Sequence, residues 1–399
     1  MSCPLNTIKN LMTESGIVEA SSVEAPLWSM GFRPFFLAAS MMAVVLIAMW
    51  GLHLAGWLFA GQNMLLWHAH EMVFGYVVAV VAGFLLTATQ NWTGRRGVHG
   101  RPLMALVGLW FLARLIFILP FVSGEIVAVV DLLFLPLLAF FLWPYLSQGG
   151  RNRVFVVLLA GLWMADLCWH GEVLGICQNS ATSGLALAVR ILVFMMVLIG
   201  GRIIPFFTGN VVKGAGLSVW PKLEKMVMFG TAVYVIAGDI LQTHFFGTVL
   251  SFFLFAVHLL RWLGWKPWET RRIPILWVLF SGYFWIVIGF FLKALADLNY
   301  ILPSVAVHAF TAGAMGVLIY GMITRVSLGH KGRPLQVTPL ITLGYVLINL
   351  AALSRTVVPA VSPVFYEWGL FLAVVFWVMA HLILVGVYWP IWTSPRISS

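Results

Sequence analysis

The sequence predicts an all-α protein, a polytopic membrane bundle of about twelve transmembrane helices. Three observations lead to this prediction. Of the 399 residues, 62% are hydrophobic and only 9% are charged, whereas soluble domains carry about a quarter charged residues. No polar stretch is long enough for a separate soluble domain. Basic residues recur after every second apolar segment. Any chemistry is therefore expected within the membrane or at its surface.

The apolar segments follow one another along almost the whole chain. A helix needs about 20 apolar residues to cross the hydrocarbon core of a bilayer, and clusters of glycine, proline and charge mark the breaks between helices. These breaks give twelve segments: 34–57, 67–90, 102–120, 125–147, 153–175, 184–207, 222–242, 244–262, 273–296, 303–325, 335–354 and 363–391.

Lysine and arginine follow the even-numbered segments, as Arg95 and Arg96 follow the second and Arg271 and Arg272 follow the eighth. The odd-numbered connections hold almost none, and Arg355 is the exception. Positively charged connections stay on the cytoplasmic side of a membrane. Both termini are therefore predicted to be cytoplasmic. The net charge of +10 is explained by topology, and no nucleic-acid partner is expected.

The N-terminal residues differ from the rest of the chain. Residues 1–25 are polar, contain Glu14, Glu19 and Glu24, and lack the apolar core of a signal peptide. They are predicted to form a flexible cytoplasmic tail, and residues 26–399 a single transmembrane domain. The three cysteines form no CxxC motif, which excludes the zinc and redox sites that use one.

The most informative motif is Trp67-His68-Ala69-His70-Glu71-Met72, at the start of the second segment. Ionisable groups are costly in or near lipid and usually mark a site. His68 and His70 diverge by roughly 200° on a regular helix, so they share one metal only if the helix starts at or after them. His68 shares a face with Glu71 and Met72. Imidazole suits copper and haem iron, thioether suits copper(I), and a carboxylate can orient an imidazole.

Other ionisable residues occur at the same predicted depth, toward the outer side. They should face the bundle interior and pair with one another. These residues are His53, His68, His70, Glu71, Arg114, Asp131, Asp166, His170, Glu172, Arg190, Asp239, His244, Lys293, Asp297 and His308. For Asp131, Asp166 and Asp239, ion pairing with Arg114, Arg190 or Lys293 is favoured over a proton-relay role.

We predict His68, His70 and His308 as metal ligands, with Glu71 as an orienting carboxylate. His308 starts the tenth segment at the depth of His68, and two imidazoles on haem iron are one way to use such a pair. His258 lies deep in the eighth segment, where ligation and capping of the helix end are both open. For His170 the two interpretations are balanced, and for His53, His99, His244, His330 and His381 a structural or solvated role is favoured.

Sequence signatures limit the rival chemistries. GxSxG, HExxH and Walker A motifs do not occur. A haem–copper oxidase needs a histidine pair on the seventh segment, and 222–242 has no histidine. A carrier remains open, because a twelve-helix bundle with buried charges and repeats is typical of one. Gly97–Leu103 and Gly329–Leu335 are similar and follow segments that begin with His-Ala. This indicates either an internal duplication or a common way to turn at a membrane surface.

The chain also resembles the NnrS family, membrane proteins associated with the bacterial nitric oxide response. The matching segments are Gly31–Phe36, Trp67–Met72, Gly83–Thr87, Asn91–Gly94, Gly201–Thr208, His308-Ala309 and Thr324–Leu335. They are long, keep their order and span nearly the whole chain. One departure is Phe280, before Gly282-Tyr283, where relatives carry a histidine. If that histidine is a ligand, this chain has lost it or binds its cofactor differently.

The resemblance implies a multi-pass protein of the bacterial inner membrane that contains haem, of b type, and copper, and that protects against nitric oxide. It strengthens the prediction of His68, His70 and His308 as metal ligands, and it also favours ligation by His258 and His170. It further implies that Arg202 and Arg325 are partners of haem propionates or of backbone groups. Three functions stay open: a haem and copper protein that lessens nitrosative stress, a carrier for a metal, haem or small anion, and an oxidoreductase that reduces nitric oxide with electrons from quinol or another donor.

Overall fold

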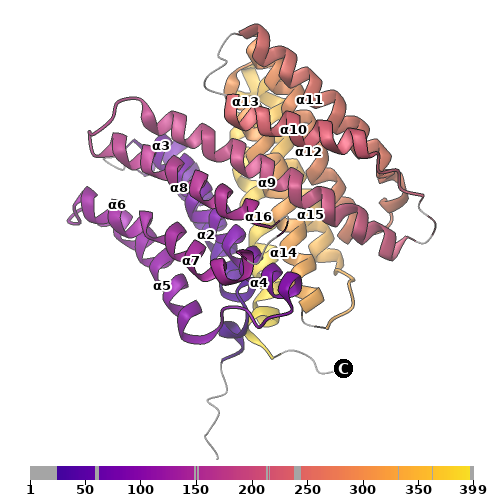
Figure 1. The fold of residues 1–399 in the computed structure, drawn as a ribbon. Coiled ribbons are helices and arrows are strands. Elements are labelled where there is room, and N and C mark those ends of the chain that lie inside the picture. Colours follow the sequence, from indigo (N-terminus) through magenta and orange to yellow (C-terminus); the bar gives the residue numbers. More distant parts are fainter. Residues whose placement is uncertain are drawn as a thin grey trace, which may run out of the picture.

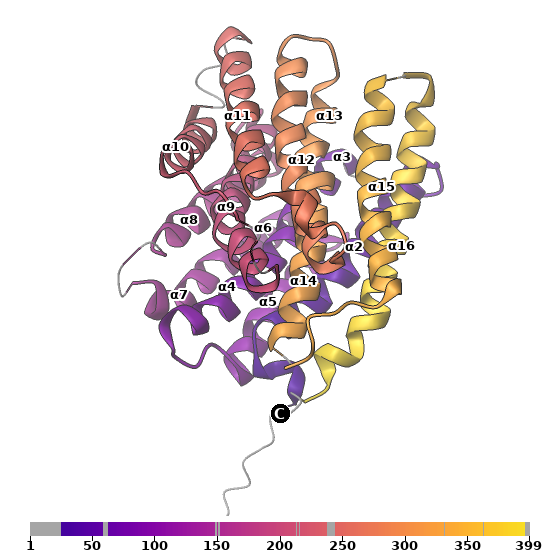
Figure 2. The same ribbon diagram turned by 90° about the vertical axis from the view of Figure 1, so that its right-hand side faces the viewer.

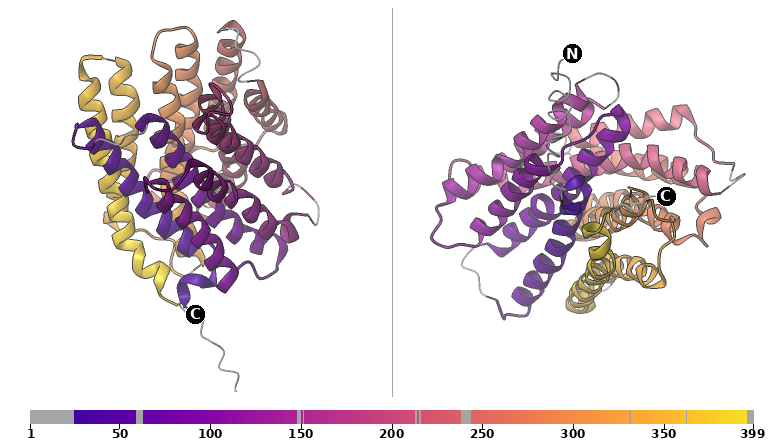
Figure 3. Two further views of the ribbon diagram at one scale, coloured as in Figure 1. Left: turned by 90° about the vertical axis from the view of Figure 1, so that its left-hand side faces the viewer. Right: turned by 90° about the horizontal axis from the view of Figure 1, so that it is seen from below.

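A computed structural model describes residues 25–58, 63–147, 150, 152–212, 214, 216–237, 244–330, 332–361 and 363–395. Every regular element in these residues is a helix, which confirms the predicted all-α class. The bundle divides into a group around α5–α8 and a group around α10–α16, with α2, α4 and α9 between them (Figures 1 and 2). The view along the bundle shows the same division (Figure 3).

The first part of the chain supplies eight α-helices, one 3-10 turn and one π-helical segment. Their bounds are η1 Pro26–Ser29, α2 Phe32–Leu54, α3 Met64–His70, η2 Glu71–Val77, α4 Val78–Thr93, α5 Gly100–Phe117, α6 Gly124–Leu132, α7 Phe134–Leu146, α8 Val154–Val173 and α9 Ser180–Val211. The second part is built in the same way. It comprises α10 Pro221–Ala237, α11 His244–Gly264, η3 Pro267–Thr270, α12 Pro274–Asp297, α13 Pro303–His308, η4 Ala309–Met315, α14 Gly316–His330, α15 Pro339–Val361, η5 Pro363–Phe365 and α16 Tyr366–Thr393.

Eleven helices in the described residues are long and apolar enough to cross a membrane, as in a multi-pass membrane protein. The seventh predicted span, 222–242, corresponds to α10, which is 17 residues long. Its predicted outer end, with Asp239, lies outside the described residues. Two spans contain a π-helical segment and are called the composite helices, since α3, η2 and α4 form one continuous helix, as do α13, η4 and α14.

Local sequence explains where these helices begin and end. The side chain of Asn63 accepts a hydrogen bond from the Leu66 N–H (3.3 Å) and so caps α3. Proline stands at the first turn of α12 and α13, where its missing N–H costs nothing. Gly94 ends α4 with φ = 68°, a left-handed conformation that favours glycine.

Two helices of the second part pack unusually closely. A Cβ on Gly289 of α12 would stand 2.5 Å from the Phe310 ring, and one on Gly313 of η4 would stand 2.6 Å from the Trp285 ring. Small residues let helix backbones approach in membranes, where packing contacts drive association. This close contact holds the π-helical segment η4 firmly against α12.

The two ends of the described chain meet through one buried arginine. Arg33 Nη1 donates to the carbonyl oxygens of Pro26 (2.7 Å), Trp392 (3.4 Å) and Ser394 (2.9 Å). Both ends therefore lie at one end of the bundle, as the topology of the spans predicts (Figure 1). We call the opposite end, where α3, α6 and α13 lie, the distal end (Figures 1 and 2).

Replacing Arg33 with alanine is expected to lower the free energy of unfolding by about 1.5–3 kcal/mol, because three carbonyls lose a charged donor. Denaturant titration in mixed micelles measures this change. Arg101→Ala is the control, since Arg101 is exposed and its loss should change stability by less than about 0.5 kcal/mol. Equal effects of the two substitutions would contradict the role of Arg33 as a tie.

Candidate functional site

A buried cluster of metal-ligating groups lies at the distal end. It comprises His70 from α3, Asp131 from α6, and Asp166 and His170 from α8, and one ligand atom of each lies within 4.8 Å of all the others. His70 Nε2 lies 3.0 Å from Asp166 Oδ1 and 3.4 Å from Asp131 Oδ2. His170 Nε2 lies 3.3 Å from Asp131 Oδ2 and 3.7 Å from Asp166 Oδ1. We call these four residues the distal cluster.

Two further charged residues support the distal cluster. Glu71 Oε1 lies 3.1 Å from Nδ1 of His70 and 3.2 Å from Nη1 of Arg114. Arg114 also forms an ion pair with Asp131. All the charged side chains involved are at least 95% buried, so their charges must be balanced within the group.

The backbone at this site is unusual. His70 ends α3, and Glu71 begins the seven-residue π-helical segment η2. Helices of this kind are rare and are found frequently at functional sites. The His70 ring packs against Trp169, with ring centres 4.1 Å apart, and against Phe74 and Phe117. This aromatic wall keeps water from the distal cluster and strengthens electrostatic interactions inside it.

A glycine in η2 makes room for the supporting charges. A Cβ on Gly75 would stand 2.7 Å from Oε2 of Glu71 and 3.3 Å from Nη1 of Arg114. Gly75→Ala is therefore expected to lower the free energy of unfolding by about 1–3 kcal/mol through overpacking. Thermal unfolding in detergent checks this, with Gly108→Ala in α5 as the control, because a Cβ there meets nothing within 4 Å. A neutral Gly75→Ala variant would contradict the expected clash.

His68 faces different neighbours from His70, because α3 already starts at Met64 and both histidines lie within it. The His68 ring stacks on Trp50 with ring centres 4.5 Å apart, and its buried Nδ1 has no hydrogen-bond partner among the described residues. His308 donates from Nδ1 to the Ser304 carbonyl (2.7 Å), which leaves Nε2 as its basic nitrogen. Both imidazoles interact electrostatically with Arg355. His68 and His308 form a second imidazole group, here called the imidazole pair.

One histidine of the imidazole pair and one of the distal cluster stand at the same place relative to a π-helical segment. His308 directly precedes the π-helical segment η4, as His70 directly precedes η2. Each composite helix therefore contains a His-Ala pair and a π-helical segment. The π-helical segment begins three residues after His68 but one residue after His308, so the similar turns still allow either an internal duplication or a common way to turn at a membrane surface.

His258 lies in a separate polar network in the other half of the bundle. Tyr283 Oη lies 2.7 Å from its Nδ1, and Thr231 Oγ1 lies 3.2 Å from its Nε2. Arg261 donates to Tyr283 Oη (2.9 Å) and pairs with Glu224. Both ring nitrogens of His258 are thus hydrogen-bonded within the protein, which makes them less available to a metal.

Two more histidines are satisfied in a similar way. His381 donates from Nδ1 to the Trp377 carbonyl (3.0 Å), and its Nε2 lies 3.2 Å from Tyr76 Oη. His53 donates to the Leu58 carbonyl (3.0 Å). These contacts agree with the structural roles favoured from the sequence.

The remaining predicted site residues lie apart from these groups or beside them. Arg202 donates to Asn152 Oδ1 (2.9 Å). Arg325 lies over the Phe207 ring, 3.6 Å from its centre, and its buried Nη1 has no hydrogen-bond partner among the described residues. Met72 follows Glu71 in η2 and is partly buried against the hydrophobic core.

Ion pairing of the outer aspartates is observed in part. Asp131 pairs with Arg114 as expected, whereas Asp166 faces two imidazoles. Lys293 pairs with Asp297. Sequence reasoning left Asp131 and Asp166 out of the ligand set, although the spacing of Asp166 and His170, four residues apart on one helix face, was a usable signal.

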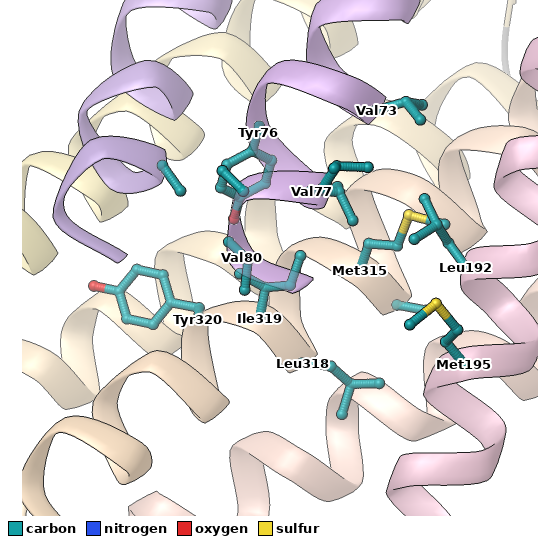
Figure 4. Close-up of a cluster of buried hydrophobic side chains, with 14 of the residues drawn as sticks. Val73, Tyr76, Val77, Val80, Leu192, Met195, Met315, Leu318, Ile319 and Tyr320 are labelled. Carbon is teal, nitrogen blue, oxygen red and sulfur yellow. The ribbon is translucent and has the colours of Figure 1, made fainter. Parts of the chain in front are cut away.

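An apolar cavity lies between the two composite helices and α9. Figure 4 shows part of its lining, with Val77 of η2, Val80 of α4, Leu192 and Met195 of α9, and Met315 of η4. Val77 and Met315 are the last residues of η2 and η4. The cavity therefore lies at the inner ends of both π-helical segments, and its lining suits only uncharged, apolar molecules.

The family model described as NnrS protein matches residues 26–396, which is nearly the whole chain. No curated protein matches the chain.

Proposed function

The chain belongs to the NnrS family, and from this premise we propose that it is a haem- and copper-binding protein of the bacterial inner membrane that protects against nitric oxide by binding or converting it. Membership of this family connects the chain with the nitric oxide response. The observation that carries the proposal is the imidazole pair, whose ring nitrogens are not all used by the protein.

The donor chemistry of the imidazole pair fits haem iron. The Nδ1 atom of His68 is buried without a hydrogen-bond partner among the described residues, which is unfavourable unless a bound group such as a metal satisfies it. In His308, the hydrogen bond from Nδ1 to the Ser304 carbonyl leaves a basic Nε2 that faces away from its own helix. The guanidinium of Arg355 nearby disfavours a bare cation, whereas it favours an anionic propionate. Haem held here by one of the two imidazoles would supply an iron at which nitric oxide can bind.

The other predicted ligands differ in how available they are. His70 Nε2 already faces two carboxylates, and both nitrogens of His258 are hydrogen-bonded. The resemblance to the family implies copper as a second metal. Imidazole nitrogen is a suitable ligand for copper(II), and thioether sulfur is a suitable ligand for copper(I). Met72 lies next to Glu71 and is the methionine nearest in sequence to His70. Ligation by His70, His258 or Met72 stays a prediction.

Spectra and metal content of the purified protein test this proposal. The wild type is expected to show a Soret band and bound copper, and His68→Ala and His308→Ala are expected to lose or shift the Soret band. His381→Ala is the matched control, because His381 is a buried imidazole whose two nitrogens are used by the protein. A wild-type protein without Soret band or metal would overturn the proposal.

Nitric oxide measurements then separate binding from conversion. With an electron donor such as a quinol, an oxidoreductase would consume many equivalents of nitric oxide, whereas a binding protein would take up a fixed amount. We expect His308→Ala to reduce either response. Consumption by the wild type that equals that of protein-free detergent, under reducing conditions, would exclude the enzymatic form of the proposal.

The carrier hypothesis has one structural observation in its favour, which is the likeness of the two composite helices. Internal repeats of this kind are typical of secondary transporters. Uptake of a metal, haem or a small anion into proteoliposomes, lost in His308→Ala, would support a carrier. Normal haem content without uptake would count against it.

A further inference from the structure

We propose that the distal cluster holds one divalent transition-metal ion, zinc or ferrous iron, in a closed four-coordinate site. This site would be separate from any haem, and the proposal does not depend on the function of the imidazole pair. It concerns His70, Asp131, Asp166 and His170, which come from three separate helices, α3, α6 and α8.

The separations between the donor atoms of the distal cluster match those of a metal site. Zinc binds histidine nitrogen and carboxylate oxygen at about 2.0–2.2 Å, so neighbouring donors of a tetrahedral site lie roughly 3.4 Å apart. Four of the six separations between the donor atoms of the distal cluster are 3.0, 3.3, 3.4 and 3.7 Å. The four donors thus already enclose a space of the size that one such ion requires.

The net charge of the distal cluster also favours a bound cation. Asp131 and Asp166 contribute two negative charges, while Glu71 and Arg114 balance each other. With neutral imidazoles the group has a net charge of −2 in a fully buried setting. An uncompensated charge of this size is costly in a protein interior, and one divalent cation neutralises it.

The supporting residues favour ligation over simple ion pairing. Glu71 Oε1 beside Nδ1 of His70 holds the proton on that nitrogen, which presents the Nε2 lone pair to the aspartates. Arg114 engages Oδ1 of Asp131 and leaves Oδ2 for the cluster. Carboxylate–histidine–metal arrangements of this form are common around zinc.

The donor set selects the ion. Two imidazoles and two carboxylates without sulfur suit zinc or ferrous iron, whereas copper(I) prefers sulfur. Haem is excluded here because all four donors lie within 4.8 Å of one another and leave no room for a porphyrin. Four protein ligands also leave no open position, which is typical of structural sites. The ion would therefore fasten α3, α6 and α8 together.

The competing interpretation is a metal-free network in which both imidazoles are protonated. It also balances the charges, since two imidazolium groups and Arg114 match three carboxylates. Metal analysis distinguishes the two. Purified wild-type protein should contain one equivalent of zinc or non-haem iron, after haem iron is subtracted, and Asp166→Asn and His170→Gln should contain at least tenfold less. Asp297→Asn, which removes a distal-end carboxylate paired with Lys293, should keep the metal.

Two further measurements keep the proposal testable if a ligand variant does not fold. Glu71→Gln, which removes no ligand but takes away the charge that orients His70 and pairs with Arg114, should weaken metal binding by about tenfold to a hundredfold. Chelated wild-type protein reloaded with cobalt(II) should show the intense visible bands of four-coordinate cobalt. Folded protein without zinc or non-haem iron, and without these bands, would overturn the proposal, and copper bound by these residues would overturn the choice of ion.

The outcome is independent of the proposed function. Loss of zinc or non-haem iron in Asp166→Asn with an unchanged Soret band would support the metal site and leave the haem proposal standing. A protein that lacks a Soret band but contains the ion would support the distal cluster alone.

Discussion

Replacing Arg114 with leucine is expected to lower the free energy of unfolding by about 3–5 kcal/mol, because breaking a buried ion pair leaves uncompensated charge. Arg114 contacts both Glu71 and Asp131, and its side chain is 4% exposed. Without it, three carboxylates and two imidazoles remain in the apolar interior. Denaturant titration in mixed micelles measures the loss.

Two companion variants show whether the effect comes from charge. Arg114→Lys keeps a cation but loses the planar fork that reaches two carboxylates, so an intermediate loss is expected. Arg114→Leu combined with Asp131→Asn removes both partners, and its loss should be smaller than the sum of the single losses. Additive losses, or a loss below about 1 kcal/mol for Arg114→Leu, would contradict the proposed ion pair.

Replacing Arg261 with alanine should be the next most damaging change, at about 3 kcal/mol. Arg261 pairs with Glu224 and donates to Tyr283 Oη and to the Val197 carbonyl (3.1 Å). Its guanidinium also lies over the Trp265 ring, 5.0 Å from the centre. This loss of unfolding free energy is at the low end of the range for a buried ion pair, because the Glu224 side chain is 28% exposed.

Tyr283→Phe is the matched control for this network, since it removes one hydroxyl and keeps the ring. It should cost about 1 kcal/mol, measured by the same titration. If Tyr283→Phe were as damaging as Arg261→Ala, the hydroxyl between Arg261 and His258 would be the stabilising element instead of the ion pair.

The bundle was predictable because hydropathy and charge act locally. Segment 273–296 reproduces α12, Pro274–Asp297, almost residue for residue, and the alternation of basic residues matches the meeting of both chain ends at Arg33. The breaks within segments were harder to foresee. Segment 125–147 is divided into α6 and α7 at Leu133, three residues before Pro136, which lacks the N–H that a continuous helix would offer to the Leu132 carbonyl.

The candidate site was predictable only where its residues are neighbours in sequence. Glu71 beside His70 was expected as an orienting carboxylate, and its Oε1 lies 3.1 Å from Nδ1 of His70. The convergence of Asp131 and Asp166 on His70 depends on how α3, α6 and α8 cross in space, which no periodicity encodes. The different neighbours of His68 and His70 follow from the helix starting before both.

The two π-helical segments have a consequence for how the sequence can change. Each widens its helix over seven residues, directly after His70 or His308. A π-helical turn holds one residue more than an α-helical turn. Deleting one residue from η2 would therefore let an ordinary α-helix re-form with the helices on either side nearly in their present orientation, whereas the same deletion in α4 would rotate His70 by about 100° relative to the rest of the helix. One residue can thus be removed from η2 without turning His70 far from Asp131 and Asp166, and deletions in α4 should be tolerated far less.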